Sequence, residues 1–166
     1  FNNDMLALFP ARWSFPKAAD PNGDYILCAN NEYFDQPLMY GDRVLTYEGS
    51  RDSCEAAYAS MGVSVVRLKN AAGAWSVVKD AAPGPSAINR RVTPFSPVIF
   101  SGPAKDHPWI KAAGAKANEL QKVSLADGAF ATGTLANCAG GWTPWGTYLT
   151  SEENFQTYML TAAKIK

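Results

Sequence analysis

The sequence predicts a mainly β protein with short helices and long loops, and the observations behind this fold class are simple. Short runs rich in β-branched and aromatic residues recur along the 166-residue chain, and turn-forming residues separate them. Two of these runs have the spacing of a β-hairpin. Hydrophobic residues make up 47% of the chain and charged residues 18%, which is typical of a folded domain. These patterns alone fit either a sandwich or a propeller.

The first half of the chain predicts a strand, an extended segment and a helix. Residues 25–30 read as a strand entered from an Asp- and Asn-rich turn at 20–24. Residues 43–47 are expected to be extended. A helix is expected over residues 52–61.

The clearest hairpin joins residues 62–68 to residues 74–79 through a turn at 70–73. Val63 and Val65 share one face of the first strand, and Val66 and Leu68 share the other. Because both faces are partly apolar, we expect this hairpin to lie inside a layered sheet.

The second half predicts shorter elements around a loop at residues 81–86. Strands are expected at 98–100, 129–135 and 146–150, and helices at 108–120 and 153–164.

Composition excludes several classes of function. Fifteen basic residues balance 15 acidic ones and no basic run occurs, which argues against nucleic-acid binding. No apolar stretch approaches the ~20 residues that cross a bilayer. The lone His107 excludes zinc sites that need two or more histidines from this chain. The chain starts at Phe1 and stops without an obvious terminal element, so we expect a fragment of a longer protein.

Residues 137–154 are the segment most suggestive of chemistry. They contain Cys138, a glycine pair, two tryptophans and the adjacent Glu152 and Glu153. A thiolate and carboxylates brought together are a plausible metal site. The other cysteines, Cys28 and Cys54, have no CxxC spacing, and three cysteines allow at most one disulfide.

The chain resembles the N-terminal part of the PhoX-type alkaline phosphatases, which are secreted bacterial enzymes that use calcium and iron. Matching blocks run in family order over nearly the whole chain, and the last is the most specific. In one block the family typically has Asn-His-Glu-Tyr, and here Asn31 replaces the histidine. The blocks are Asn3-Asp4, Asn30-Asn31-Glu32-Tyr33 with Leu38-Met39, residues 61–66, residues 89–93 with 101–104, and residues 137–154.

The resemblance implies that residues 1–166 are the N-terminal part of a single β-propeller domain with metals around its axis. It implies a calcium- and iron-dependent phosphomonoesterase, periplasmic or secreted, completed by the rest of the propeller chain. The alternatives are a non-catalytic propeller scaffold or binding module, which the Asn31 departure motivates, and a phosphodiesterase.

The candidate metal ligands are Cys138, one of Glu152 and Glu153, and Glu32. By the resemblance, Cys138 would bind iron; without it, the thiol would be an ordinary buried residue. Adjacent residues of an extended segment point to opposite faces, so we expect Glu153 to be the ligand and Glu152 to stabilise the start of the following helix. The simpler alternative is that both are solvated. Glu32 suits calcium, and Asp4 is a weaker candidate of the same type.

Arg90 and Arg91 are the candidate catalytic residues, because one of them could contact a phosphate bidentately. The alternative is a solvated or ion-paired arginine. Asn89 could hydrogen-bond nearby or simply form a turn. Trp142 and Trp145 are expected to pack in the core or line the site.

Overall fold

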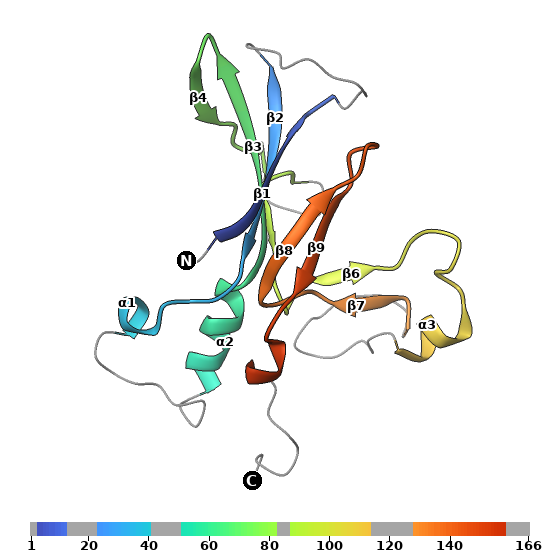
Figure 1. Ribbon diagram of the computed structural model, residues 1–166. Helices are drawn as coiled ribbons and strands as arrows, with labels where there is room; N and C mark the ends of the chain where they lie inside the picture. Colours follow the sequence, from blue (N-terminus) through green and yellow to red (C-terminus); the bar gives the residue numbers. More distant parts are fainter. Residues whose placement is uncertain (1–2, 13–22, 41–50, 83–86, 114–127, 159–166) are drawn as a thin grey trace.

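The protein is mainly β, as predicted. The computed structural model describes residues 3–12, 23–40, 51–82, 87–113 and 128–158. Within these ranges the strands form three separate antiparallel sheets, and no closed ring of blades is found among them (Figure 1).

The largest sheet has five strands, and β3 is its centre. Strand β2 pairs with β3 over its whole length, and β1 pairs with the outer side of β2. On its other side, β3 pairs first with β5 and then with β4. The strands are β1 (Asn3–Pro10), β2 (Asp24–Asn31), β3 (Gly62–Ala71), β4 (Ala74–Val77) and β5 (Arg90–Val92).

Alternate residues of this sheet build the core. Ala7 and Phe9 of β1, Cys28 of β2, and Val63 and Val65 of β3 are all buried and pack together. This period of two confirms that Val63 and Val65 share a face. Strand β2 and the β3–β4 hairpin were predicted, whereas β1 was not.

The turn between β3 and β4 shows why the prediction of this hairpin was correct. Ala72 and Gly73 both have positive φ, 51° and 92°, which a tight hairpin turn of this hand requires. The Asn70 side chain accepts a 2.8 Å hydrogen bond from the Gly73 N–H and closes the turn.

Two small sheets complete the β structure. Strand β6 (Pro97–Ile99) pairs with β7 (Phe130–Thr132), and β8 (Asn137–Trp142) pairs with β9 (Tyr148–Glu152). The β8–β9 hairpin runs beside the large sheet (Figure 1). Tyr148 packs edge-to-face on Phe9, with ring centroids 6.3 Å apart, and so attaches this hairpin to the core.

The helices are short. The predicted helix at 52–61 is confirmed as α2 (Arg51–Ser60), whereas α1 (Gln36–Tyr40) was not predicted. Helix α3 (Pro108–Ala113) confirms the start of the 108–120 prediction. Residues 155–158 form only a 3₁₀ turn, η1 (Phe155–Tyr158). The extended segment at 43–47 and the distal parts of the 108–120 and 153–164 helices lie outside the described residues.

The predicted strand at 129–135 is shorter than expected. Strand β7 stops at Thr132 because the next residue, Gly133, has a positive φ of 35° and turns the chain. The strand predicted at 146–150 is displaced to Tyr148–Glu152, since Gly146 lies in the turn of the hairpin with φ of 85°.

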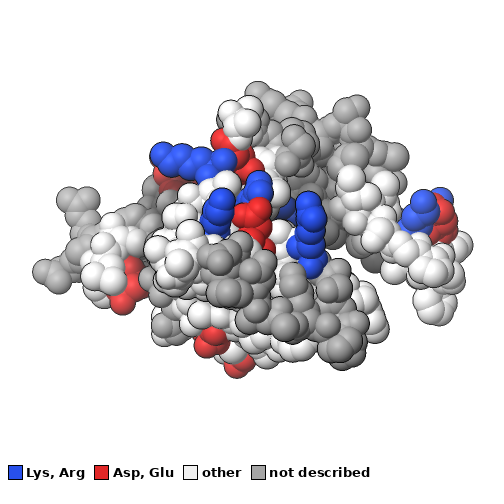
Figure 2. Space-filling model, turned by 90° about the horizontal axis from the view of Figure 1, so that it is seen from above, with Lys and Arg blue, Asp and Glu red and all other residues white. Residues whose placement is uncertain are grey.

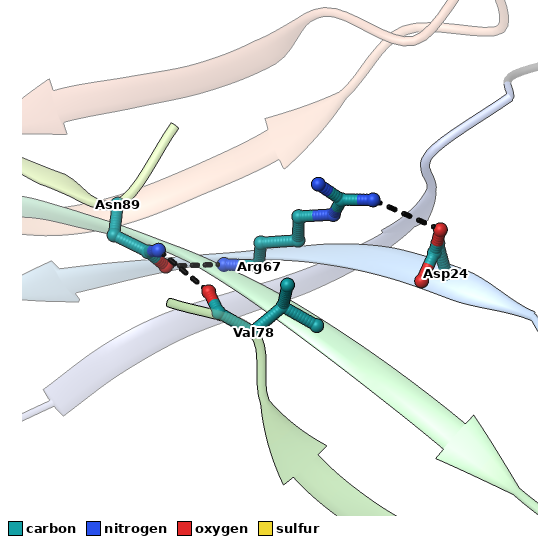
Figure 3. A network of polar contacts seen from close by, with 4 residues as sticks. All are labelled: Asp24, Arg67, Val78 and Asn89. Carbon is teal, nitrogen blue, oxygen red and sulfur yellow. Dashed lines mark hydrogen bonds and ion pairs between the residues drawn. The ribbon is translucent and has the colours of Figure 1, made fainter. Parts of the chain in front are cut away.

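Asn89 has a structural role in the large sheet. Its side chain accepts a hydrogen bond from the Arg67 N–H at 2.8 Å and donates one to the Val78 carbonyl at 2.8 Å, while the Arg67 guanidinium pairs with Asp24 at 3.0 Å (Figure 3). Asp80 accepts from the N–H groups of Ile88 and Asn89. These bonds fix the chain just before β5.

Charged side chains of both signs are mixed on the face seen from above, with no separate basic patch among the residues drawn (Figure 2). None of the described helices is long and apolar enough to cross a membrane. All three cysteines are free.

Candidate metal centre

Three potential ligands meet at the end of the large sheet where β1 starts and β2 finishes. A carboxylate oxygen of Asp4, a carboxylate oxygen of Glu32 and the Sγ atom of Cys138 all lie within 4.8 Å of one another. Asp4 belongs to β1, Glu32 directly follows β2, and Cys138 belongs to β8. Asp4 is exposed and the other two are half-buried, so the cluster is open to ions from solvent.

Irregularities in two strands position the thiol and one carboxylate. The β1–β2 register shifts between Asn3 and Leu6, and the β8–β9 register shifts between Asn137 and Gly140. Such bulges re-aim side chains out of the regular alternation. As a result Asp4 and Cys138 face each other, and the Cys138 thiol donates a 2.7 Å hydrogen bond to Asp4 Oδ2.

The electrostatics of the cluster favour a cation. The hydrogen bond that the thiol donates to Asp4 is the largest cause that raises the pKa of Cys138 to about 12, and the Glu153 carboxylate acts in the same direction. The pKa is raised because a thiolate would sit among carboxylates of the same charge. A bound cation reverses this effect, since it attracts the thiolate and the carboxylates together. The donor set of one sulfur and several carboxylate oxygens therefore fits a metal ion.

Glu152 and Glu153 point to different places, as the alternation of an extended segment predicts. Glu152 Oε1 accepts hydrogen bonds from Thr134 Oγ1 at 2.9 Å and from the Leu135 N–H at 3.1 Å. It therefore holds the loop before β8 and does not stabilise a following helix. Glu153 Oε1 accepts a hydrogen bond from Asn154 Nδ2 at 3.2 Å, and its carboxylate is near enough to the Cys138 thiol to raise the pKa of that thiol, although it is not one of the three clustered ligands. The ligand role of Glu153 stays a prediction.

Gly140 lets β8 approach its neighbours. A Cβ atom on Gly140 would lie 2.6 Å from the Leu149 carbonyl oxygen, closer than real Cβ contacts come, and 3.0 Å from Met5 Cγ, which is a tight contact. Only a glycine fits here, so Gly140 brings the strand that carries Cys138 against the strand that carries Asp4.

Asn31, which replaces the histidine typical of the family, is buried and committed to the sheet. Its side chain accepts from Asn3 Nδ2 at 3.0 Å and donates to Ser64 Oγ at 2.9 Å and to the Gly62 carbonyl at 3.3 Å. The three clustered ligands come together without it.

The two arginines diverge from β5, as expected for neighbours in a strand. Arg91 donates to the Ser60 carbonyl at the end of α2, at 2.5 Å. Arg90 donates to the Ile88 carbonyl at 3.1 Å and lines a largely apolar cavity of about 440 Å³ together with Cys28. Neither of these contacts involves the metal cluster, and a phosphate-binding role for Arg90 or Arg91 stays a prediction.

The remaining candidates lie on the surface. His107 is exposed, accepts a hydrogen bond from the Trp109 N–H through Nδ1 and packs against that indole. Trp142 and Trp145 are 53% and 74% exposed, so they do not pack in the core of the described residues. The other alternative, that they line the site, stays a prediction.

Sequence reasoning underrated Asp4 and missed Asn30. Asp4 was only a weak candidate because nothing in the sequence predicts that its strand bulges toward β8. Asn30 is fully buried and bonds to the main chain of Cys138. The signal in the sequence was that Asn30 is a polar residue at the end of an apolar strand, directly before Asn31 and Glu32.

The fold and the cluster define a mainly β protein with a thiol–carboxylate site suited to a cation. The chain matches the family model described as alkaline phosphatase PhoX over residues 1–166, and it belongs to this family. It is also similar to a solved structure, Pseudomonas fluorescens PhoX in complex with vanadate, a transition state analogue. That match has 33% sequence identity and a TM-score of 0.65, and it covers 99% of this chain but 24% of that chain. The chain therefore spans about a quarter of the length of that relative. A comparison with curated protein sequences gives no match.

Proposed function

We propose that this chain supplies part of the metal centre of a phosphomonoester hydrolase, an alkaline phosphatase in its full-length form. The observation that carries the proposal is the convergence of Asp4, Glu32 and Cys138 from three separate segments. Family membership supports the reaction class, and the relative's complex with vanadate supports a phosphoryl substrate.

The proposed centre holds iron and calcium. Cys138 and Glu153 are the ligands proposed for iron, because a thiolate suits a transition metal better than it suits calcium. Glu32 and Asp4 are proposed for calcium, which prefers carboxylate oxygens. Bound metal ions would polarise the phosphoryl oxygens of the ester and neutralise charge that develops on them.

The protein groups have distinct tasks in this proposal. Asp4 and Glu153 hold the thiol proton in the absence of metal, and they become ligands or close neighbours of the ion when that proton leaves. Arg90, which lines the cavity, is proposed as the arginine that contacts a phosphate oxygen, since the Arg91 guanidinium is engaged at the end of α2. Residues outside this chain are proposed to close the propeller and complete the ligand set, in a periplasmic or secreted protein.

Hydrolysis of p-nitrophenyl phosphate by the full-length protein, purified with its metals, tests the proposal. We expect activity that is lost in Cys138→Ala and after calcium chelation. Cys54→Ala is the matched control, because Cys54 lies on α2 and is absent from the cluster. Equal rates for Cys138→Ala, the chelated protein and the wild type would refute the metal mechanism.

The same assay separates the alternatives. A folded protein that contains no iron and hydrolyses no ester would be a scaffold or binding module. Faster hydrolysis of bis(p-nitrophenyl) phosphate than of the monoester would show a phosphodiesterase. The departure at Asn31 gives little support to the scaffold, because the Asn31 side chain bonds within the sheet and leaves the three ligands in place.

A further inference from the structure

Asn30 is a buried polar residue whose hydrogen-bonding capacity is completely used. It lies on β2 with none of its surface exposed. Its Nδ2 atom donates to the carbonyl oxygens of Cys138 at 2.8 Å and of Ala139 at 3.2 Å. Its Oδ1 atom accepts from Tyr148 Oη and Thr150 Oγ1, both at 2.9 Å. A carboxamide has two donor hydrogens and two acceptor lone pairs, and each has a partner within hydrogen-bond distance. The single Tyr148 hydroxyl proton is shared between Asn30 Oδ1 and the Met5 carbonyl oxygen.

The two carbonyl groups that Asn30 binds belong to the residues that the β8–β9 register skips. The β8–β9 register is interrupted between Asn137 and Gly140, which is where Cys138 and Ala139 lie. A bulge disrupts the ladder locally, and an unpaired buried carbonyl costs free energy. Asn30 supplies donors to these two carbonyls from the large sheet, so it stabilises the irregular conformation that aims the Cys138 side chain.

Tyr148 extends the same network to the other bulge. Its hydroxyl lies 2.9 Å from Asn30 Oδ1 and 3.1 Å from the carbonyl oxygen of Met5, which follows Asp4 in β1. Asn30 and Tyr148 thus bind main-chain carbonyls at Cys138 and beside Asp4. In the described contacts, neither residue hydrogen-bonds to the thiol or to the carboxylate itself.

We propose that Asn30, assisted by Tyr148, is a positioning residue that holds the Asp4 and Cys138 bulges in register for metal binding. This inference rests on the proposed function, because it assumes that Cys138 is a ligand. Partners of this kind around a metal site commonly change its affinity by ~10- to 100-fold. Asn30 acts on the ligands through the main chain and is not itself expected to contact the ion.

Cobalt binding to the metal-stripped full-length protein tests this role. Co²⁺ bound by a thiolate gives a charge-transfer absorption in the near ultraviolet, which we expect in the wild type and not in Cys138→Ser. In Asn30→Ala we expect a weaker band and a dissociation constant raised by ~10- to 100-fold. Tyr148→Phe removes only the hydroxyl, and we expect a smaller change in the same direction.

Asn89→Ala is the matched control. Asn89 also hydrogen-bonds main-chain groups of two segments, but it lies in the part of the sheet shown in Figure 3 and touches no cluster residue in the described contacts. We expect this variant to melt at a lower temperature and still bind Co²⁺ with the wild-type spectrum. If Asn30→Ala does not fold, Tyr148→Phe is compared with Asn89→Ala instead.

The outcomes are distinct. Wild-type cobalt spectra and affinity in Asn30→Ala and Tyr148→Phe would overturn the inference, and so would an equal loss in Asn89→Ala. A wild type with no thiolate band would overturn the metal role of Cys138 itself. In that case alkylation of Cys138 by iodoacetamide decides on positioning: faster reaction in Asn30→Ala than in Asn89→Ala supports it, and equal rates refute it.

Discussion

Met5 on β1 lies so close to Gly140 on β8 that a single added methyl group would be in tight contact with it. A Cβ atom on Gly140 would come within 3.0 Å of Met5 Cγ and 2.6 Å of the Leu149 carbonyl oxygen. The next residue, Gly141, has no neighbouring atom within 4 Å of the same position. The glycine pair beside Cys138 therefore contains one glycine that packing requires and one that packing does not.

We expect Gly140→Ala to lower the free energy of unfolding by ~1–3 kcal/mol, because the methyl group must push the main chain of β9 or the side chain of Met5 away. Gly141→Ala should stay close to the wild type and is the control. Urea denaturation of both variants measures the difference. Equal stabilities of Gly140→Ala and Gly141→Ala would contradict the close packing of Gly140 against Leu149 and Met5.

Asp4→Asn should make the Cys138 thiol more reactive in the metal-free protein. The pKa of this thiol is raised to about 12, with the hydrogen bond to Asp4 as the largest cause, so loss of the Asp4 charge lowers the pKa. A fall of one unit gives a roughly tenfold larger thiolate fraction near pH ~8, and the thiolate is the reactive form. Alkylation rates of Cys138 followed by mass spectrometry across pH test this. If the pH midpoint of the alkylation rate in Asp4→Asn equals that of the wild type, Asp4 does not control the pKa of the thiol.

Glu153→Gln and Glu152→Gln should have different effects although the residues are adjacent. The Glu153 carboxylate is near enough to the thiol to raise its pKa, so we expect substitution of Glu153 to weaken Co²⁺ binding by at least about tenfold, with little change in melting temperature. Glu152 bonds Thr134 and Leu135, so its substitution should lower the melting temperature and leave cobalt affinity near the wild-type value. The reverse pattern would assign the ligand role to Glu152.

Asp80 should make stability depend on pH in the acid range. The hydrogen bond from the Ile88 N–H, followed by those from Asn89, lowers the pKa of Asp80 below its ordinary value. A lowered pKa in the folded state stabilises the fold above the pKa of the unfolded chain, and this contribution is lost as pH falls through the folded pKa. We therefore expect Asp80→Asn to be less stable than the wild type near pH ~7 and to approach it near pH ~3. If the stability difference between Asp80→Asn and the wild type is the same at both pH values, Asp80 does not cause this pH dependence.

Local patterns predicted the β3–β4 hairpin and α2, because the turn residues and the apolar alternation that specify them lie within one short segment. Strand β1 was missed because its pairing depends on β2, a separate segment of the chain, and not on a pattern within residues 3–10. Strand β8 was missed because Gly140 and Gly141 have low strand propensity, and its pairing depends on β9 and its packing on β1.

The candidate site was predictable in its residue types but not in its geometry. The Cys138 segment and Glu32 carried recognisable sequence patterns, and adjacency in a strand was enough to predict that Glu152 and Glu153 diverge. The place of Asp4 and the role of Asn30 depend on two register shifts and on the contact of β1 with β8, which are far apart in the chain. No local pattern encodes such a shift, since it results from the packing of β1 against β8.

The hydrogen bond between Cys138 and Asp4 joins positions 134 residues apart, and this sets an order of assembly. At a synthesis rate of ~5–20 residues per second, Cys138 is synthesised roughly 7–27 seconds after Asp4. Until then Asp4 and Glu32 are the members of the cluster that exist, and both offer carboxylate oxygens, which suit hard ions such as calcium. The proposed iron site needs the sulfur, so it can form only after β8 has docked beside β1.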